Sequence, residues 1–418
     1  MWFMQLTRPD VLSAYAAALA AVDPRAAVAR SVALKDSTLT IGDHAFGDVA
    51  PSDVLVVAIG KAAPAMAVGV HDVLGPGRGF IACTHPADVP YPMCVGSHPL
   101  PDASSVRCGR SLVDVVQHTK PSDVIVFLVS GGGSAAASLP ADGITVTELA
   151  EMNTELLESG LPIEDINEVR AAVSQIKGGR LGAVTTAQRQ VTLVLSDVVG
   201  AGPEYVASGP SIGFGLGGRA GSVVTESGLR AKLPRSVVRA VDDFVCPTVP
   251  EALMHTTIGS PVIAAYAAAA DLRSRGFDAS VATTELVGEA RKEAVALAVV
   301  TAPGTVAVAA GETTVSIRGT GSGGRNQEAA LAVAMASEGR EVVFAALGTD
   351  GIDGPTAAAG AVVDGRTAIR AKELGIDLPG ALSDNDSHSA LTALGATVVT
   401  GPTGTNVADL WIAAKGPF

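Results

Sequence analysis

An apolar run leads directly into three consecutive glycines and a serine in the segment 124–135, VIVFLVSGGGSA. Glycines let a backbone turn sharply and leave peptide N–H groups uncovered, and the positive end of a following helix adds to the attraction for an anion. We therefore predict that a phosphate or carboxylate group binds at Ser130, Gly131, Gly132, Gly133 and Ser134. The alternative is a tight turn that binds no ligand.

Two further apolar runs end at charged residues. Lys61 follows the run 54–59 and Gly60, and a lysine at such a turn is able to reach a phosphate as a point charge, although most lysines are simply solvated. The GxxxxGK[ST] spacing of a P-loop is absent. Asp197 stands just past the run 191–195, where a carboxylate holds Mg²⁺, accepts a proton or caps the following turn. The sequence leaves these three roles open.

A set of polar residues between these runs is spaced three, four and three positions apart: Asn167, Arg170, Ser174 and Lys177. On one helix they would share a face. Such a face is either solvated or borders a site, and the glycine pair 178–179 at its end is compatible with a site. We include Asn167, Arg170 and Lys177 among the candidate binding residues.

A second cluster of candidates lies in the last third of the chain. Glu312 precedes a predicted strand, and Arg325 and Asn326 open a predicted helix after the glycine-rich loop 319–324. The helix dipole disfavours a cation in the first turn, so we expect Arg325 to serve an anionic ligand. The alternative is an ordinary exposed arginine.

Two polar loops follow this cluster. Asp350 and Asp353 lie in the glycine-rich segment 348–356, and Asn406 ends the polar loop 401–406. The two aspartates bind a metal or ribose hydroxyls, or they form Asx-turns.

The elements that carry these residues alternate in type along the chain. Stretches with helical periodicity separate short β-branched runs, which is typical of an α/β protein with a mainly parallel sheet. The predicted strands are 54–59, 80–83, 124–129, 191–195, 279–283, 305–309, 313–317, 342–347, 396–400 and 410–413. Helices are predicted over 103–118, with Asp102 as its N-cap, and over 229–244. The glycine-rich segment 209–221 and the prolines at 247 and 250 predict two domains, 1–240 and 241–418.

Composition excludes several classes of function. The chain has 418 residues, with 29 Lys and Arg against 42 Asp and Glu, which gives a net charge of −13. A chain this acidic has no general attraction for nucleic acid or for an anionic membrane surface. Its 48% hydrophobic content is ample for a large core, so the chain is not disordered.

The remaining features indicate a cytoplasmic protein. The longest uncharged run, 294–311, is interrupted by Pro303 and Gly304 and predicts helix, turn and strand rather than a membrane span. The N-terminus lacks the pattern of a signal peptide. The four cysteines show no CxxC and no regular spacing, so we predict a reduced protein with neither a zinc site nor a disulfide framework.

The ordered set of motifs resembles the class II glycerate kinase (glycerate 2-kinase) family, whose C-terminal module carries the MOFRL name. The resemblance rests on IGKAAPAM (59–66), HPLPDASS (98–105), SGGGSA (130–135), INEVRAAVSQIKGGRLG (166–182), SDVVG (196–200), ASGPS (207–211), GETTV (311–315), GGRNQE (323–328), GTDGIDGPT (348–356) and TGPTGTNVADL (400–410). It covers nearly the whole chain. Family members commonly carry an aspartate at the position of Ala201 and at that of Ala357, which puts any metal role there in doubt.

The resemblance implies a fold and an activity. It implies a Rossmann-like, three-layer α/β/α N-terminal domain, a mixed α/β MOFRL-type C-terminal domain and an active site in the cleft between them. The implied reaction is phosphorylation of D-glycerate by ATP and Mg²⁺ to give 2-phosphoglycerate. The catalytic residues then correspond to Lys61, Asp197 and Arg325, with Asp197 also a candidate Mg²⁺ ligand.

Two other activities are kept as alternatives. One is a kinase of another small hydroxy acid, because specificity depends on a few contacts that the sequence does not locate. The other is a hydroxypyruvate reductase using NAD(P)H, although the GxGxxG spacing with a downstream acid is absent from both glycine-rich loops. A non-catalytic sensor of a sugar acid is disfavoured because a pure binder needs no base. The expected partners are small molecules, and an Ala-rich helical surface is compatible with a homodimer.

Overall fold

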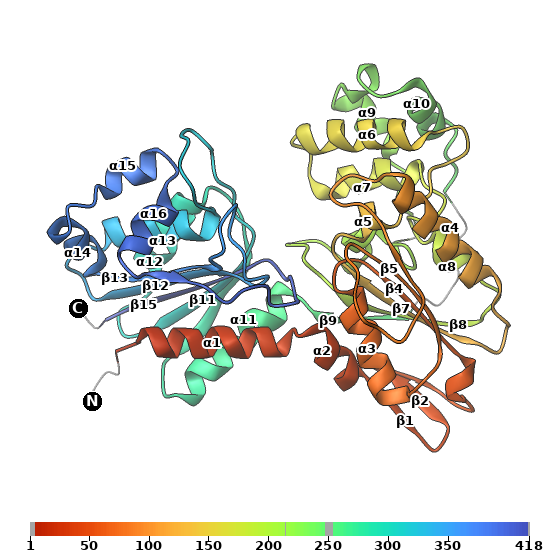
Figure 1. Cartoon of the computed structure of the whole chain (residues 1–418), viewed down its shortest axis with the longest axis horizontal. Coiled ribbons are helices and arrows are strands. Elements are labelled where there is room, and N and C mark those ends of the chain that lie inside the picture. Colours follow the sequence, from red (N-terminus) through yellow and green to blue (C-terminus); the bar gives the residue numbers. More distant parts are fainter. Residues whose placement is uncertain (1–4, 214, 247–253, 417–418) are drawn as a thin grey trace. The chain divides into compact units, whose positions relative to one another are not determined.

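The computed structural model describes residues 5–213, 215–246 and 254–416. The chain forms two compact units, unit 1 (Met1–Asp23 and Gly259–Phe418) and unit 2 (Pro24–Ile258), which are coloured along the chain in Figure 1. The limits predicted from the sequence, 1–240 and 241–418, differ from this division. The difference arises because the first helix, α1 (Arg8–Ala21), packs against α11 (Pro261–Ser274) of the second half.

Unit 2 is built on a six-stranded sheet with the strand order β6-β5-β4-β7-β8-β9. Its strands are β4 (Val54–Ile59), β5 (Arg78–Cys83), β6 (Met93–Val95), β7 (Val124–Ser130), β8 (Arg189–Leu195) and β9 (Met254–Gly259). β4 pairs in parallel with β5 and β7, β5 pairs in parallel with β6, and β7 pairs in parallel with β8. β4 is followed along the chain by β5 and β6, which lie on one side of it in the sheet. β7 lies on the other side of β4 and is followed by β8, one position farther out. The topological switch point therefore lies between β4 and β7.

Helices cover both faces of this sheet. Every residue of β4 and β7 is buried, which is the pattern of strands enclosed on both faces. α4 (Ala103–Gln117) shares a hydrophobic core with alternate residues of β4 and β7, while α3 (Ala63–Leu74) packs on β4, β5 and β7. The expected three-layer, Rossmann-like architecture is confirmed.

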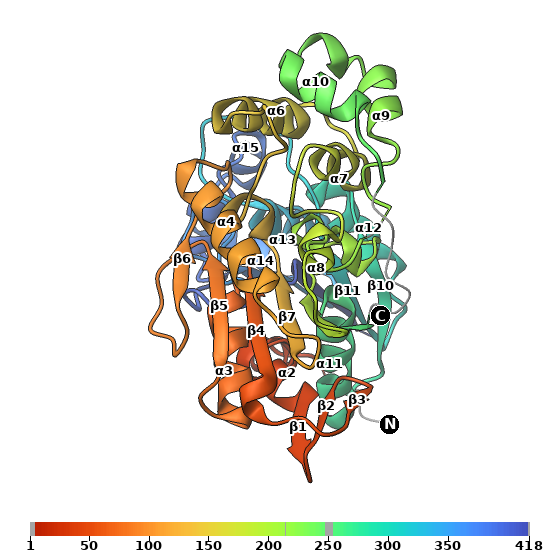
Figure 2. The same ribbon diagram turned by 90° about the vertical axis from the view of Figure 1, so that its right-hand side faces the viewer.

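Unit 2 also carries two smaller substructures. A three-stranded antiparallel sheet consists of β1 (Val32–Lys35), β2 (Thr38–Ile41) and β3 (His44–Phe46). A helical cluster with its own core is seen at the top of Figure 2 and consists of α6 (Val146–Glu158), α7 (Ile163–Ala172), α9 (Ala220–Glu226) and α10 (Arg235–Asp242). The shorter helices are α2 (Pro24–Ser31), α5 (Gly133–Ala136), α8 (Arg180–Ala183), η1 (Pro51–Asp53), η2 (Pro203–Ser208) and η3 (Leu229–Ala231).

Unit 1 is built on a six-stranded mixed sheet with the order β10-β11-β15-β12-β13-β14. β10 and β11 pair in parallel, and the other neighbours pair antiparallel, as expected for a mixed second domain. The strands are β10 (Ala279–Leu286), β11 (Val306–Gly311), β12 (Val342–Gly348), β13 (Gly360–Asp364), β14 (Thr397–Val398) and β15 (Asp409–Lys415).

The helices of unit 1 lie on the two faces of its sheet. Figure 1 shows α1 and α11 on one side and the remaining helices on the other. These are α12 (Ala290–Val300), α13 (Arg325–Ala336), α14 (Thr367–Glu373), α15 (Leu378–Ser383) and α16 (Ser387–Ala393). α13 packs on β12 and β13, and its buried residues share a core with Phe344 and Trp411.

Several predicted elements match the structure closely. β4 has the predicted limits, and 294–311 contains the end of α12, a turn and β11. Asp102 caps α4, since its carboxylate accepts hydrogen bonds from the backbone N–H groups of Ser104 (2.7 Å) and Ser105 (3.3 Å).

Two predicted elements are wrong. Segment 313–317 is not a strand; Thr314 forms an isolated bridge with Glu289, and the side chain of Ile317 is 83% exposed. The segment has the β-branched composition of a strand but does not enter the sheet. The helix predicted over 229–244 is two helices, η3 and α10, because Pro234 disfavours helical geometry in the residue before it.

The prediction of a protein without disulfides is also wrong. Cys94 of β6 and Cys108 of α4 form a disulfide, with their Cα atoms 5.4 Å apart. The sequence spacing of 14 residues gave no sign of it, because the strand and the helix come together only in the fold. Cys83 and Cys246 are free thiols.

In the described part of the chain, no single helix is both long and apolar enough to cross a membrane. α1 and α2 meet that criterion only when taken as a pair bent by 52°.

Candidate active site

The loops after β4 and β7 are joined at the switch point of unit 2. The backbone N–H of Lys61 donates to the carbonyl of Gly131 at 2.8 Å, and the hydroxyl of Ser130 accepts from the N–H of Ala62 at 3.1 Å. Gly60 has a φ of +119°, and a Cβ there would lie 2.3 Å from the carbonyl oxygen of Ser130. Ser130 is only 1% exposed, so its contacts favour a structural role in fixing the two loops.

The Asp197 carboxylate lies against the glycine loop 131–133. A Cβ on Gly131 would be 2.0 Å from Asp197 Oδ2, so this close approach requires glycine at position 131. His98 approaches the next residue, since a Cβ on Gly132 would be 3.4 Å from His98 Cδ2. Burial, and secondarily the charge of Lys61, lower the pKa of His98, which favours a neutral imidazole.

The glycine loop is followed by a much shorter helix than expected. α5 has four residues, and its N-cap Gly132 is in the left-handed conformation, with a φ of +78°. One helical turn has a small macrodipole, so any anion at this loop depends on side chains and individual peptide groups.

The predicted polar face at 167–177 is not a single helical face. α7 ends at Ala172, and Ser174 and Lys177 lie in the turns that follow. All four polar residues of this set are nevertheless buried, with exposed fractions between 1% and 9%. These residues are therefore buried inside unit 2 although they do not lie on one helix, and they do not form a solvated surface.

A hydrogen-bond network links three of the predicted residues behind the glycine loop. The Ser134 and Ser208 hydroxyls are 2.8 Å apart, and Ser208 Oγ donates to Asn167 Oδ1 at 2.6 Å. Lys177 Nζ donates to the Ser134 carbonyl at 2.7 Å. The structure thus brings Ser134, Asn167 and Lys177 together.

Two buried cations adjoin this network. Arg170 is 9% exposed and its Nε donates to Asn153 Oδ1 at 2.8 Å, while Lys177 is 3% exposed. Among the described residues neither has a carboxylate within ion-pair distance. Burial and the nearby Arg170 lower the pKa of Lys177 to about 7, and burial lowers the pKa of Arg170 to about 10. Because buried charges are costly without a partner, this arrangement suits an anionic ligand.

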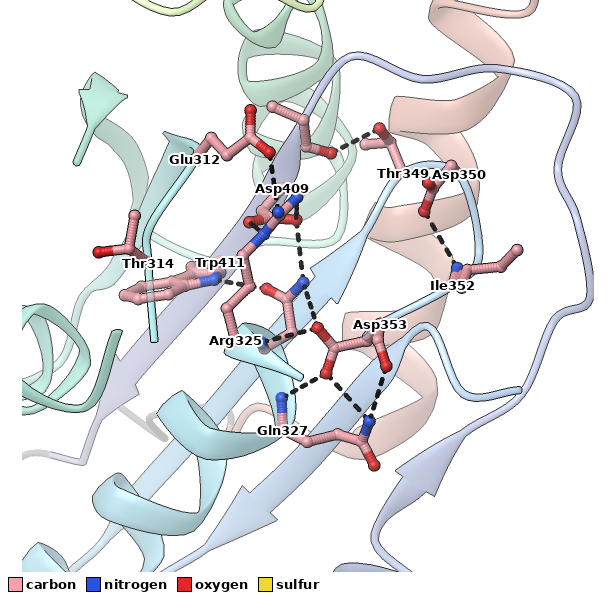
Figure 3. Close-up of polar contacts among 12 residues, drawn as sticks. Glu312, Thr314, Arg325, Gln327, Thr349, Asp350, Ile352, Asp353, Asp409 and Trp411 are labelled. Carbon is pink, nitrogen blue, oxygen red and sulfur yellow. Dashed lines mark hydrogen bonds and ion pairs between the residues drawn. The ribbon is translucent and has the colours of Figure 1, made fainter. Parts of the chain in front are cut away.

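Arg325 of unit 1 is paired with two carboxylates, as Figure 3 shows. It occupies the first position of α13, as predicted. Its Nε and Nη2 lie 2.6 and 3.1 Å from the two carboxylate oxygens of Asp409, and its Nη1 lies 2.8 Å from Glu312 Oε1. Burial opposes the charge, but the two carboxylates outweigh it and raise the pKa of Arg325. Arg325 is therefore a fixed, fully charged guanidinium, unlike an ordinary exposed arginine.

The other predicted residues of unit 1 make local contacts. The Asp353 carboxylate accepts from the backbone N–H groups of Asn326 (3.0 Å) and Gln327 (2.8 Å), and so satisfies the start of α13. Asp350 Oδ1 accepts from the N–H of Ile352 (3.0 Å), and Asn406 Oδ1 accepts from the N–H two residues later (3.2 Å). These contacts favour the Asx-turn alternative for Asp350 and give Asn406 the same kind of local turn.

Comparison with known proteins identifies the family. Residues 10–242 match a family described as a domain of unknown function (DUF4147), and residues 305–409 match the MOFRL family. A D-glycerate 2-kinase from Thermotoga maritima is 37% identical over 379 residues, covering 86% of this chain and 90% of the relative. The chain belongs to the class II glycerate kinase family.

The fold agrees with this glycerate kinase assignment. The crystal structure of glycerate kinase from T. maritima superimposes with a TM-score of 0.85 at 34% identity, covering 97% of this chain and 99% of that one. A relative from Agrobacterium vitis with the provisional name hydroxypyruvate reductase is 37% identical over 380 residues, covering 85% of this chain and 86% of the relative. The family thus includes proteins named for two activities.

Sequence reasoning missed several residues that contact the predicted candidates of this glycerate kinase-family chain. His98, Ser208 and Asp409 lie beside Gly132, Asn167 and Arg325, respectively. Each belongs to one of the motifs that carry the family resemblance, but its contact is with a residue far away in sequence. Asp409 offered one local signal, a charged residue directly before the apolar run 410–414.

Proposed function

We propose that this protein transfers the γ-phosphoryl group of ATP to the 2-hydroxyl of D-glycerate, giving 2-phosphoglycerate and ADP. The observation that carries the proposal is the meeting of Lys61, the glycine loop and Asp197 at the switch point of the unit 2 sheet. Open α/β sheets bind their ligands at such points. The relationship to a D-glycerate 2-kinase supplies the substrate.

In the proposed reaction, the 2-hydroxyl oxygen of glycerate attacks the γ-phosphorus. The bond from that phosphorus to the oxygen bridging the β-phosphate breaks, and ADP leaves with the bond's electron pair. Asp197 either accepts the hydroxyl proton as general base or holds Mg²⁺. Lys61 neutralises charge on the transferring phosphoryl group, and peptide N–H groups of the loop 131–133 add hydrogen bonds.

Arg170 and Lys177 are proposed to bind an anionic group of a substrate, a carboxylate or a phosphate. The proposal is supported by their burial without a carboxylate partner in the described residues. Lys177 is held at the Ser134 carbonyl, and Asn167 is held by Ser208, so both are oriented beside the glycine loop. Arg325 is proposed to neutralise the other anionic group, with Glu312 as its replaceable partner.

Mg²⁺ is proposed as the companion of ATP. In the described residues no group of three or more His, Cys, Asp or Glu side chains is arranged as a metal site. Mg²⁺ is commonly bound through one or two carboxylates together with substrate phosphates. In the second of its two alternative roles, Asp197 would hold the ion, and the ion would neutralise phosphate charge.

The test is to incubate the protein with ATP, Mg²⁺ and D-glycerate and to identify the product by ³¹P NMR. A 2-phosphoglycerate signal is expected. Asp197→Asn should lower kcat by about 10²- to 10⁴-fold, the usual range for loss of a general base. Asp114→Asn changes a carboxylate that is 72% exposed on α4 and serves as the matched control. Full activity of Asp197→Asn would remove Asp197 from the mechanism.

The same experiment distinguishes the other activities. A 3-phosphoglycerate signal would keep the kinase but change the nucleophilic hydroxyl, and a product only with another hydroxy acid would change the substrate. Oxidation of NAD(P)H with hydroxypyruvate, without any phosphorylated product, would favour the activity named for the A. vitis relative.

We also propose a cytoplasmic homodimer that acts on small molecules. Light scattering after size-exclusion chromatography tests the oligomeric state. The Cys94–Cys108 disulfide provides a test of compartment, because such bonds are rare in cytosolic proteins. If the protein is cytoplasmic, reductants should open this pair, and thiol titration of protein taken directly from cells should detect four free thiols. Detection of only Cys83 and Cys246 would contradict the cytoplasmic location.

A further inference from the structure

The Arg325 guanidinium has two kinds of partner. The Asp409 side chain is 1% exposed, and its two carboxylate oxygens accept hydrogen bonds from Nε and Nη2 of Arg325. The Glu312 side chain is 50% exposed and forms an ion pair with Nη1 alone. An ion pair with an exposed carboxylate is weak and easily exchanged, and a buried two-point contact fixes geometry. The contact with Asp409 is therefore fixed, whereas the contact with Glu312 is readily exchanged.

Asp409 is itself held from behind. Its Oδ1 also accepts from Asn326 Nδ2 at 2.9 Å, and Asn326 Oδ1 accepts from the Trp411 indole N–H at 2.8 Å. Trp411 is fully buried on β15, and the Asn326 backbone N–H is bound to Asp353. Figure 3 shows Asp409, Arg325, Trp411 and Asp353 close together.

We infer that Asp409 is the positioning residue for Arg325. It binds Nε and Nη2 of the guanidinium and so leaves Nη1, which contacts Glu312 in this structure, to bind an anionic group of the substrate. The inference rests on the proposed function of Arg325. In it the substrate anion replaces Glu312, while Asp409 stays bound before and after the exchange.

The kinetic test compares Asp409→Asn with the wild type. Misplacement of a guanidinium that acts on the transition state should lower kcat by about 10²-fold, with KM for ATP changed much less. Asp271→Asn, which alters an exposed Asp–Arg pair on α11, is the matched control and should keep its activity. Glu312→Gln should instead lower KM for the anionic substrate, because it removes the competing carboxylate.

A double-mutant cycle separates positioning from a structural role. In an Arg325→Met background, Asp409→Asn should cause no further loss of kcat, because its effect acts through Arg325. An equal loss in both backgrounds, or unchanged kcat in Asp409→Asn, would overturn the inference. If Asp409→Asn does not fold, Asp409→Glu keeps the charge but displaces the carboxylate by one methylene group, and it should show the same loss.

If the wild type does not phosphorylate glycerate, the proposed function is refuted, and the inference about Asp409 then needs a measurement that does not depend on turnover. The Arg325 Nε–H signal in ¹H–¹⁵N NMR, assigned by its absence in Arg325→Lys, should be protected from exchange in the wild type. It should be lost in Asp409→Asn and retained in Asp271→Asn. Retention of the signal in Asp409→Asn would contradict the positioning role.

Discussion

Replacing Gly131 by alanine tests the role of the Asp197 carboxylate without changing the carboxylate itself. The new Cβ would stand 2.0 Å from Asp197 Oδ2, whereas real Cβ contacts essentially never fall below 3.0 Å. The backbone at Gly131 is outside the left-handed region, so alanine introduces no φ strain there. The end of the Asp197 side chain therefore has to move away from residue 131, while the backbone fold stays unchanged.

The retreat of at least about 1 Å sets the expected effect, because a misplacement of that size costs roughly 10²-fold in rate. This loss corresponds to about 2.7 kcal/mol of transition-state stabilisation. The free energy of unfolding should change by less than about 1 kcal/mol, since alanine costs little where its backbone geometry is allowed.

The assay is ³¹P-monitored turnover of ATP and D-glycerate, with thermal unfolding measured in parallel. Gly221→Ala, on α9, is the control because its Cβ would have no atom within 4 Å. Wild-type kcat in Gly131→Ala would refute the reasoning, since it would mean that the position of Asp197 does not matter to the reaction. An equal loss in Gly131→Ala and Gly221→Ala would point to a general effect on the fold.

Three further predictions concern titration and packing. The pKa of Lys177 in the folded protein is lowered to about 7, so the unfolded chain binds a proton on this lysine at higher pH than the folded chain does. The free energy of unfolding should therefore fall as pH drops from about 9 through 7. Denaturant titration of Lys177→Met should show a smaller change of this free energy with pH. Burial raises the pKa of Asp409 to about 6 although Arg325 opposes this, so kcat should fall below about pH 6 as Asp409 protonates. Asp409→Asn should lack that acid limb in a pH–rate profile. Tyr15→Phe removes the 2.6 Å hydrogen bond to the Gly348 carbonyl and should cost about 1 kcal/mol in urea unfolding.

The sequence predicts the fold where local pattern and tertiary environment agree. The apolar runs at β4 and β7 are continuous because both faces of the sheet are covered, so their limits are readable from composition. Segment 313–317 (TTVSI) also contains β-branched residues but is not continuously apolar, and it lies outside the sheet, so β-branched composition alone does not decide whether a segment joins a sheet. Pairing of strands decides this, and it is set by residues elsewhere in the chain.

The candidate site was predictable in its residue types and less so in its contacts. Lys61 and Asp197 follow apolar runs, and the carboxyl ends of neighbouring parallel strands meet at one edge, so their proximity to the glycine loop follows from the order of elements. Helical spacing predicted one shared helical face for Asn167, Arg170 and Lys177, whereas α7 ends five residues before Lys177 and the lysine is buried. The partner of Arg325 was missed because Asp409 is 84 residues away.

The return of α1 to the C-terminal half makes unit 2 an insertion within unit 1. Residues 24–258 leave the ribosome as one continuous piece, and their parallel sheet is complete before α11 is synthesised. α1 has no cover until then, because its buried residues Val11, Ala14, Tyr15 and Ala18 face partners made later. For the same reason, a fragment starting at Gly259 would expose the alanine face of α11, and adding a peptide of residues 5–23 should restore its solubility.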